Sequence, residues 1–298
     1  MSKHLVPFSK RKVIDTSPSA DVRHLTGIKG TPLDEFLGLL KHEENFLVWV
    51  DERHEIITDQ AKELKQLKGN ATSKGPAGGK EGTFTKYRWY AEQLVVLEAI
   101  NAFETFFKKT FIQLGTAVQD YVQLDAIKGL NIDARILWSI TGQVSVPALV
   151  FEQSLFHDLD AIDAATHTLI GERRYNQNAN KNALADRIRA LRAIFQVRHT
   201  LSHNNGLVTD SDGAKFKRIR FDVKAKEVVD PGKDRLGEAI FKELADEAAD
   251  FTNWLAGAAS TYLTKCVKER GLAVPKTKLA EFEAALGKHK SWASVPWS

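Results

Sequence analysis

The chain has 298 residues, of which 43% are hydrophobic and 27% are charged, a composition that excludes a largely disordered protein. The 42 basic residues nearly balance the 38 acidic ones, so a nucleic-acid site would have to come from local clusters of charge. The single cysteine, Cys266, excludes an internal disulfide framework, and we expect a packing thiol in a reducing compartment. Apolar runs are all shorter than the roughly 20 residues of a membrane span, and the start lacks a secretory core. We therefore expect a cytoplasmic protein without a membrane partner.

The first part of the chain predicts an arm, a helical extension and a connector. Residues 1–31 contain a basic triplet at 10–12 and scattered proline, serine and glycine, which is typical of a flexible arm. Thr31 as the cap and Pro32 in the first turn predict a helical extension over residues 32–68, as one helix or two. The glycine-rich residues 69–83 predict a connector. They do not match a phosphate-binding loop, because no strand precedes them.

Residues 84–275 predict a large helical domain. Apolar residues at helical spacing from Phe84 to about Leu124 indicate one long helix, and we expect a break near Gly115. A second helix is expected over 154–169 and a last long one over 236–270. The tail, residues 276–298, predicts one short helix and a loose end. Together these elements predict a mostly α-helical bundle with an N-terminal extension.

A polar loop precedes the next helix and contains Arg173, Arg174 and Tyr175. Two guanidinium groups and an aromatic ring are suited to binding RNA phosphates and stacking on a base. The same residues also suit a solvated connection between two helices, and the sequence leaves both interpretations open.

The densest reactive chemistry lies at the end of an amphipathic helix. Apolar residues recur at helical spacing from Leu184 to Leu201, and Asn205-Gly206 predicts the end of the helix. Arg198 and His203 are five positions apart, so they lie about 140° apart around the helix axis unless the last turn unwinds. His199 and His203 are four positions apart and share a face.

The segment after Gly206 alternates basic and apolar residues over 215–223, the period of a half-buried strand. We expect a small exposed β-hairpin, with residues 226–229 as the second strand. Its cations form the strongest positive cluster of the chain and are candidate RNA contacts: Lys215, Lys217, Arg218 and Arg220.

Arg198, four intervening residues and His203, with the polar His199 after the arginine and Asn204 after the histidine, resemble the motif of the HEPN family (higher eukaryotes and prokaryotes nucleotide-binding). The resemblance implies a HEPN-like helical bundle which, in many members, is a metal-independent endoribonuclease. It also implies a homodimer in which the motifs of two protomers meet at one site. Such enzymes often serve as toxins or antiviral effectors and are restrained by an antitoxin or another regulatory partner.

RNA cleavage by the ribose 2′-hydroxyl needs a proton acceptor, a proton donor and stabilisation of negative charge on phosphorus. By this interpretation His203 is the main acid or base, Arg198 binds the phosphate, and His199 is a secondary group. Asn204 would donate a hydrogen bond to the backbone or the ribose. Glu104, which lies among aromatic residues, could pair with Arg198 or orient a histidine, or simply be exposed.

Three other interpretations remain. His199 and His203 could share a zinc ion, but no glutamate lies between them and no nearby acid precedes Asp210 to complete a set of three ligands, so we expect no metal or other cofactor. The module could bind nucleotides, RNA or a protein partner without cutting. The arginine and the two histidines could also merely cap and solvate the end of a core helix.

Overall fold

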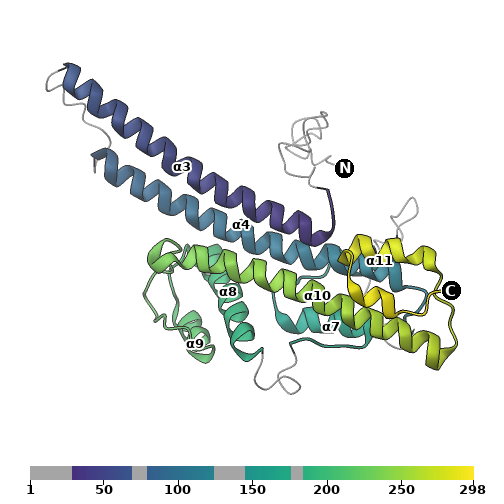
Figure 1. Cartoon of the computed structure of the whole chain (residues 1–298). Helices are drawn as coiled ribbons and strands as arrows, with labels where there is room; N and C mark the ends of the chain where they lie inside the picture. Colours follow the sequence, from purple (N-terminus) through teal and green to yellow (C-terminus); the bar gives the residue numbers. More distant parts are fainter. Residues whose placement is uncertain (1–28, 69–78, 124–144, 176–183) are drawn as a thin grey trace, which may run out of the picture.

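The computed structural model describes residues 29–68, 79–123, 145–175 and 184–298, and in these ranges it is built mainly from helices (Figure 1). The mostly α-helical architecture predicted from the sequence is therefore confirmed for this part of the chain. The expected basic arm and most of the expected glycine-rich connector lie outside the described residues.

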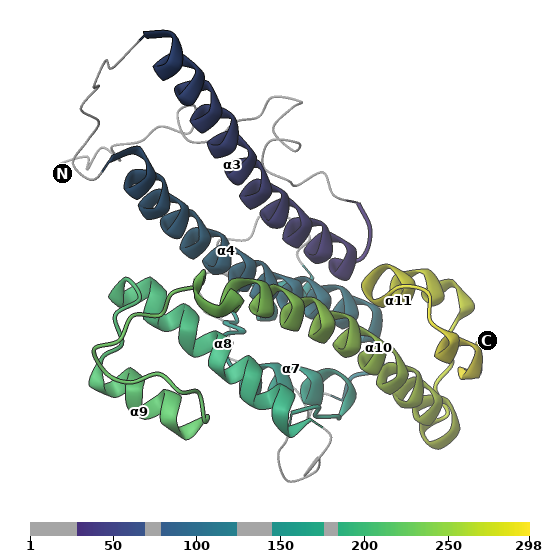
Figure 2. The same ribbon diagram turned by 60° about the vertical axis from the view of Figure 1, so that its left-hand side comes forward.

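Two long helices, α3 (Pro32–Lys68) and α4 (Gly79–Val118), form a hairpin whose far end projects from the rest of the molecule (Figures 1 and 2). The predicted start of α3 is confirmed, because Thr31 Oγ1 accepts from the backbone N–H of Asp34 at 3.2 Å. The backbone N–H of Thr31 in turn donates to the Asp34 carboxylate at 2.8 Å, so each residue caps the other. Helix α4 begins at Gly79, earlier than the connector predicted to run to residue 83.

The break expected near Gly115 is wrong, since α4 continues through it to Val118. A Cβ atom at Gly115 would lie 2.8 Å from the Cβ atom of Pro147, in the short helix α6 (Val146–Phe151). The glycine therefore permits α6 to approach α4 closely. Its role is in packing, and it costs the helix only a small loss of intrinsic stability.

The body of the molecule consists of helices packed on α4 and on one another. Those that contact α4 are α7 (Leu159–Ile170), α8 (Ala185–Asn204) and α10 (Leu236–Arg270), and α9 (Asp210–Arg218) packs against α8. Helix α7 ends at Gly171, which adopts the left-handed conformation expected of a helix-ending glycine. Helix α10 has the bounds predicted from its apolar spacing and lies along α4 in both views (Figures 1 and 2).

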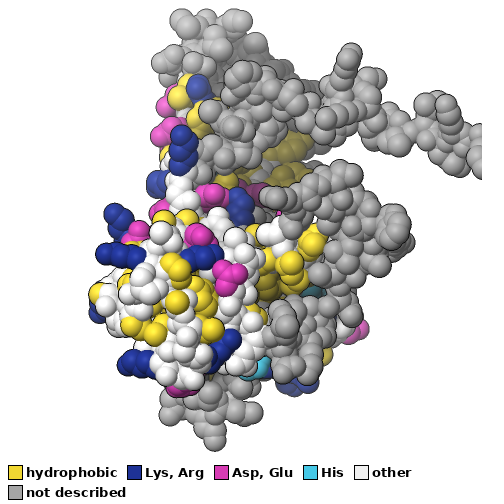
Figure 3. Space-filling view, turned by 90° about the vertical axis from the view of Figure 1, so that its right-hand side faces the viewer, with side chains coloured by type: hydrophobic (Ala, Val, Ile, Leu, Met, Phe, Trp, Pro, Cys, Tyr) yellow, Lys and Arg dark blue, Asp and Glu magenta, His cyan; other side chains and the backbone are white. Residues whose placement is uncertain are grey.

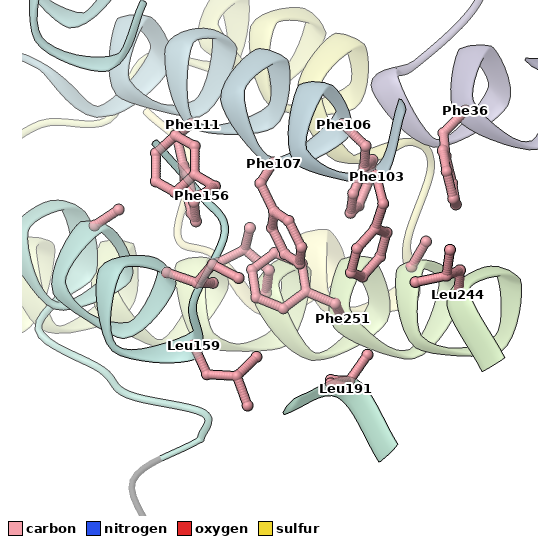
Figure 4. Packing of buried hydrophobic residues seen from close by; sticks show 14 of the residues in the cluster. Phe36, Phe103, Phe106, Phe107, Phe111, Phe156, Leu159, Leu191, Leu244 and Phe251 are labelled. Atoms are coloured by element: carbon pink, nitrogen blue, oxygen red, sulfur yellow. The ribbon is translucent and has the colours of Figure 1, made fainter. Parts of the chain in front are cut away.

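The core between α4 and α10 is rich in phenylalanine (Figure 4). Phe107 of α4 meets Phe251 of α10 edge to face, with ring centroids 4.9 Å apart. Phe36 of α3 is also fully buried and packs against Phe103 of α4 at 5.5 Å. Such pairs add about 1 kcal/mol each to the free energy of burial. The near half of the predicted extension thus shares one core with the body, and Cys266 is buried in it as expected.

The C-terminal segment is packed, so the loose end predicted for the tail is wrong. After the 3₁₀ turn η3 (Lys276–Lys278) come the predicted short helix, α11 (Leu279–Leu286), and the 3₁₀ turn η4 (Lys290–Ser294). Trp292 is 4% exposed and donates its indole N–H to the carbonyl of Gly287 at 3.1 Å. Trp297 donates its own to the carbonyl of Trp292 at 2.8 Å. Figure 3 views this end of the molecule, where described basic and acidic side chains are interspersed.

The predicted β-hairpin over residues 215–223 is wrong. Residues 210–218 form α9, which begins with a reciprocal cap between Thr209 and Asp212. Phe216 is the large apolar side chain of α9 and is fully buried, so one apolar residue anchors a short helix in which five of the other eight residues are charged. Residues 226–229 do pair with another segment, but through an isolated antiparallel bridge between Leu207 and Val228. The alternation of residue types therefore reflects one face of a helical turn and the extended chain after it.

In the ranges that the structure describes, we find no helix with both the length and the apolar character needed to cross a membrane.

Candidate functional site

Helix α8 ends where the sequence predicted. Asn205 and Gly206 have φ angles of +48° and +83°, and both backbone N–H groups donate to the carbonyl of Thr200. Thr200 itself is buried, whereas His203 and Asn205 are exposed. The last turn of the helix is thus anchored on one side and open to solvent on the other. The residues of the Arg-x4-His motif occupy the last two turns of α8.

Arg198 points toward α4. Its Nε–H donates to Oδ1 of Asn101 at 3.0 Å, and Nε lies 3.4 Å from Oε1 of Glu104. The pairing that the sequence suggested for Glu104 is therefore present. Because the N–H is directed at Asn101, the contact with Glu104 is an ion pair and Oε1 accepts no hydrogen bond. The side chain of Arg198 is 30% exposed, so it remains accessible to an anion.

Glu104 occupies an unusual electrostatic position. Burial raises the pKa of its carboxyl group, and the positive charges of Arg198, His157 and Lys108 lower it only in part. His157 is exposed just before α7 and is close enough to act on this carboxylate. The carboxylate thus restrains the guanidinium group of Arg198 without a strong hydrogen bond.

The two histidines of the motif face α9. Their rings lie 4.8 Å apart between centroids, which confirms the shared face expected from their spacing. His199 Nε2 lies 3.8 Å from Oδ1 of Asp212 in α9. Burial lowers the pKa of His199, and Lys215, His203 and Arg198 lower it further, whereas Asp212 raises it. His199 is therefore uncharged at neutral pH and able to accept a proton.

Asp212, like Asn101, is a residue of this site that the sequence did not reveal. Its side chain is buried and accepts hydrogen bonds from Asn204 Nδ2 and Gln196 Nε2, each at 2.9 Å. Burial acts to raise the pKa of Asp212, but the hydrogen bonds from Thr209 and Asn204 outweigh it and the pKa is lowered. The carboxylate stays charged and joins the end of α8 to the start of α9. The spacing Thr209-x-x-Asp212, typical of a capping box, is the pattern that would have indicated it.

The predicted catalytic residues fall into two groups around the end of α8. Arg198 and Glu104 lie toward α4, while His203 and Asn204 lie toward α9. His199 lies between the groups, since both Arg198 and His203 act on its pKa. Arg198 and His203 therefore lie on different sides of the helix, as their five-residue spacing predicted, and His199 lies between them.

The assignment of Arg174 as an RNA contact is wrong. Arg174 is 7% exposed, and its Nε donates to Oε1 of the fully buried Glu247 at 3.0 Å. The guanidinium group also lies over the rings of Tyr175 and Trp254. Tyr175 is buried as well and donates its hydroxyl to Glu247 at 2.7 Å. Both side chains stabilise the core, and only Arg173 of the predicted trio is exposed.

The remaining predicted RNA contacts are exposed on α9 and just after it: Lys215, Lys217, Arg218 and Arg220. Lys217 and Arg220 line a surface hollow of about 580 Å³ together with Lys224, and Asp210 and Asp222 also line it. Of these cations Lys215 lies near enough to His199 to lower its pKa, and those that line the hollow are partly balanced by its carboxylates.

Within the described ranges, no group of three or more His, Cys, Asp and Glu side chains is arranged to hold a metal ion. Comparisons of the chain with protein-family models, with curated proteins and with solved structures found no match.

Proposed function

We propose that this protein is a metal-independent endoribonuclease of the HEPN type, with its site at the end of α8. The observation that carries the proposal is the pair of adjacent imidazoles, one of them exposed, beside an arginine whose guanidinium remains accessible. An accessible imidazole pair and a guanidinium provide the three functions that 2′-hydroxyl attack requires.

In the proposed reaction the 2′-oxygen forms a bond to phosphorus as the bond between phosphorus and the 5′-oxygen breaks. One imidazole accepts the 2′-hydroxyl proton, and a second gives a proton to the leaving 5′-oxygen. The uncharged state of His199 suits the acceptor, which leaves His203 as the donor. Arg198 binds the phosphate oxygens as their negative charge increases. The products are a 2′,3′-cyclic phosphate and a 5′-hydroxyl.

Asp212 is a positioning residue in this scheme. Its carboxylate lies 3.8 Å from Nε2 of His199 and accepts a hydrogen bond from Asn204, so it keeps both side chains in place when RNA binds. Exposed cations, of which Lys215 acts on His199, extend the contact with the RNA backbone in this proposal: Arg173, Lys215, Lys217, Arg218 and Arg220. We further propose a cytoplasmic toxin or antiviral effector that acts as a homodimer, in which the motifs of two protomers meet at one site, and that an antitoxin or other regulatory partner restrains.

The test is cleavage of tRNA and total RNA by the purified protein in EDTA. His203→Ala and Arg198→Ala should each lower the rate by roughly 10² to 10⁴-fold. Ser202→Ala, at an exposed position between them, is the matched control and should leave the rate unchanged. A deoxyribose at the scissile position should block cleavage. Unchanged cleavage by His203→Ala would remove the assignment.

The dependence of the cleavage rate on pH, on the acid side of its optimum, gives a second test. The pKa of His199 is lowered from 6.5, so this residue stays uncharged until the pH falls below that value. The rate should therefore fall only at pH below about 6.5. In Asp212→Asn the pKa of His199 should fall further, because the negative charge that raises it is lost, and the acid limb should move to lower pH.

One observation favours the second candidate, a module that binds RNA, nucleotides or a protein partner without cutting. The Nε–H and part of the charge of Arg198 are already satisfied by Asn101 and Glu104. A binding module would keep its affinity for single-stranded RNA in His203→Ala and show no cleavage in either form. Fluorescence anisotropy and gel analysis of the same samples distinguish the two functions.

A further inference from the structure

The projecting hairpin of α3 and α4 exposes two stripes of large apolar side chains. Each stripe follows the three-to-four-residue period of one helix face. The six side chains are between 46% and 63% exposed: Phe46, Trp49 and Ile56 of α3, and Tyr87, Tyr90 and Leu94 of α4. Large exposed apolar areas of this kind mark interaction sites more often than single exposed residues do.

Both stripes lie on the same side of the hairpin. The line of contact between the helices is fixed by the Arg88 Nε to Asp51 Oδ1 bond at 2.7 Å and by His54 stacked on Phe84. At 100° per residue, Phe46 and the α4 stripe lie roughly 80–140° from that line, and because the helices are antiparallel these rotations lead to the same face. Trp49 and Ile56 lie roughly 170° from the line, at the outer edge of that face.

The opposite side of the hairpin is partly covered by α10. A groove of about 700 Å³ runs there, with Val48 of α3, Val96 of α4 and Phe241 of α10 among the lining residues. The exposed stripes therefore belong to the face that α10 does not reach, which we call the aromatic face. The views of the hairpin agree with this placement, since α10 approaches it from one side (Figures 1 and 2).

Charges on the aromatic face are segregated along its length. Arg53 lies toward the far end and places its guanidinium over the ring of Trp49 at 5.5 Å. Glu43 and Glu98 lie toward the body, on facing helices and close enough to repel each other. Burial and this repulsion raise the pKa of Glu43 to about 7. Among the described residues, neither carboxylate has a cation within ion-pair distance.

We propose that the aromatic face binds the same face of a second copy of this chain, in an antiparallel arrangement related by a two-fold axis near Trp49 and Tyr90. Such an axis places the basic end of one copy against the acidic end of the other, so the face is complementary to itself. Arg53 lies about 6 Å from the level of the axis, and Glu98 about 12 Å on the other side. The two levels differ by roughly 6 Å, which the long side chain of Arg53 can span. RNA is a poorer occupant, because the face offers one arginine and two carboxylates.

The available area agrees with a dimer of moderate strength. Six side chains of this size, each about half exposed, offer roughly 600 Å² per copy. Two copies would bury roughly 1,200 Å², the lower limit for a specific interface, and Trp, Tyr and Arg are the residues that contribute most in such interfaces. We therefore expect a dissociation constant in the micromolar range.

This interface is distinct from one that would join two α8 ends. Arg198 contacts α4 at Asn101, eleven residues and about 17 Å from the level of Tyr90. The two copies of Arg198 would then be roughly 33 Å apart along the hairpin. Self-association through the aromatic face is thus independent of the proposed nuclease activity, and mass measurements test it without a cleavage assay.

The experiment is sedimentation equilibrium of the full chain between 1 and 100 µM. The unmodified protein should self-associate, and the double variant Trp49→Ala with Tyr90→Ala should raise the dissociation constant at least tenfold. Leu155→Ala, which removes a 65% exposed side chain elsewhere, should leave it unchanged. A monomer at 100 µM, or association unaffected by the double variant, overturns the proposal.

A charge exchange tests the two-fold arrangement itself. Arg53→Glu places three carboxylates at one contact, and Glu98→Arg places two cations there, so each should weaken the dimer several-fold. The two substitutions together restore opposite charges across the axis and should recover most of the affinity. Recovery supports the antiparallel pairing, and failure to recover overturns it. Circular dichroism of each variant verifies that the helices are retained.

Discussion

The Nε atom of Arg198 lies 3.4 Å from Oε1 of Glu104, so the arginine of the motif is held by a carboxylate before any ligand arrives. The carboxylate offsets part of the charge that would attract RNA, but it also restricts the arginine to fewer conformations. If the offset of charge is the larger effect, the Glu104–Arg198 pair weakens RNA binding. If the restriction of conformations is larger, the pair strengthens RNA binding.

We expect Glu104→Gln to increase affinity for single-stranded RNA several-fold at low salt, because the charge of Arg198 is no longer offset. Stability should not fall, since burial already disfavours the charged form of Glu104. Fluorescence anisotropy with a cleavage-resistant RNA measures the effect, with the exposed Glu238→Gln as control. Weaker binding by Glu104→Gln would show that the carboxylate acts mainly by positioning Arg198.

Arg174→Met should destabilise the protein by about 3 kcal/mol. The substitution leaves the fully buried carboxylate of Glu247 without its closest cation, and breaking a buried ion pair typically costs 3–5 kcal/mol. The lower end of that range applies because Arg187 still lies 3.3 Å from Glu247. Urea unfolding gives the value, and the exposed neighbour Arg173→Met should change stability by less than about 0.5 kcal/mol. Equal losses in the two variants would contradict the buried role of Arg174.

Asp212→Ala should lower the free energy of unfolding by about 2 kcal/mol. The carboxylate caps α9 and accepts hydrogen bonds from Asn204 and Gln196, and loss of a cap or a buried acceptor costs about 1–2 kcal/mol each. Asp210→Ala, in the same first turn but exposed, is the control. Because the pKa of Asp212 is lowered, its contribution is present above about pH 3.8 and is lost as the pH falls through the lower folded-state pKa. Acid unfolding of the two variants should therefore converge.

Two glycines in long helices should respond in opposite ways to alanine. Gly257→Ala in α10 adds a methyl group with nothing within 4 Å and should stabilise the protein by up to about 1 kcal/mol. Gly115→Ala forces a Cβ atom to 2.8 Å from Pro147, and the resulting strain should give a net loss of about 1–2 kcal/mol. Thermal and urea unfolding give both values, and a stabilised Gly115→Ala would mean that α6 moves away easily.

Glu43→Gln should stabilise the protein at pH 8 and have little effect at pH 4.5. The pKa of Glu43 is raised to about 7 from 4.5, so its proton-linked stability is present below pH 4.5 and is lost as the pH rises through 7. The gain at pH 8 should be about 1 kcal/mol, well below the full value of the shift, because the side chain is partly exposed. Urea unfolding of both proteins at the two pH values measures it. A gain independent of pH would contradict the raised pKa.

Much of the fold followed from helical periodicity and from caps. Thr31, Gly171 and Asn205 end or begin helices where local sequence predicted, because capping depends on a few neighbouring residues. The errors arose where tertiary contacts decide the outcome. The alternation over 215–223 resembles a strand, but burial of Phe216 and the cap at Asp212 favour a helix.

The candidate site was predictable in part for the same reason. The shared face of His199 and His203 follows from their spacing, whereas the partners of Arg198 come from a helix about a hundred residues away. Nothing in the local sequence distinguishes Arg173 from Arg174, yet one is exposed and the other faces Glu247. Pairings between distant segments cannot be read from periodicity, and they decide which charged residues are available to a ligand.

The position of the covering helix near the C-terminus also affects folding during translation. Phe107 and Phe111 of α4 pack against Phe251 of α10, so a nascent chain that has not yet reached α10 leaves these rings exposed to water. Such an intermediate exposes apolar surface throughout most of translation. We therefore expect the nascent chain to depend on chaperones.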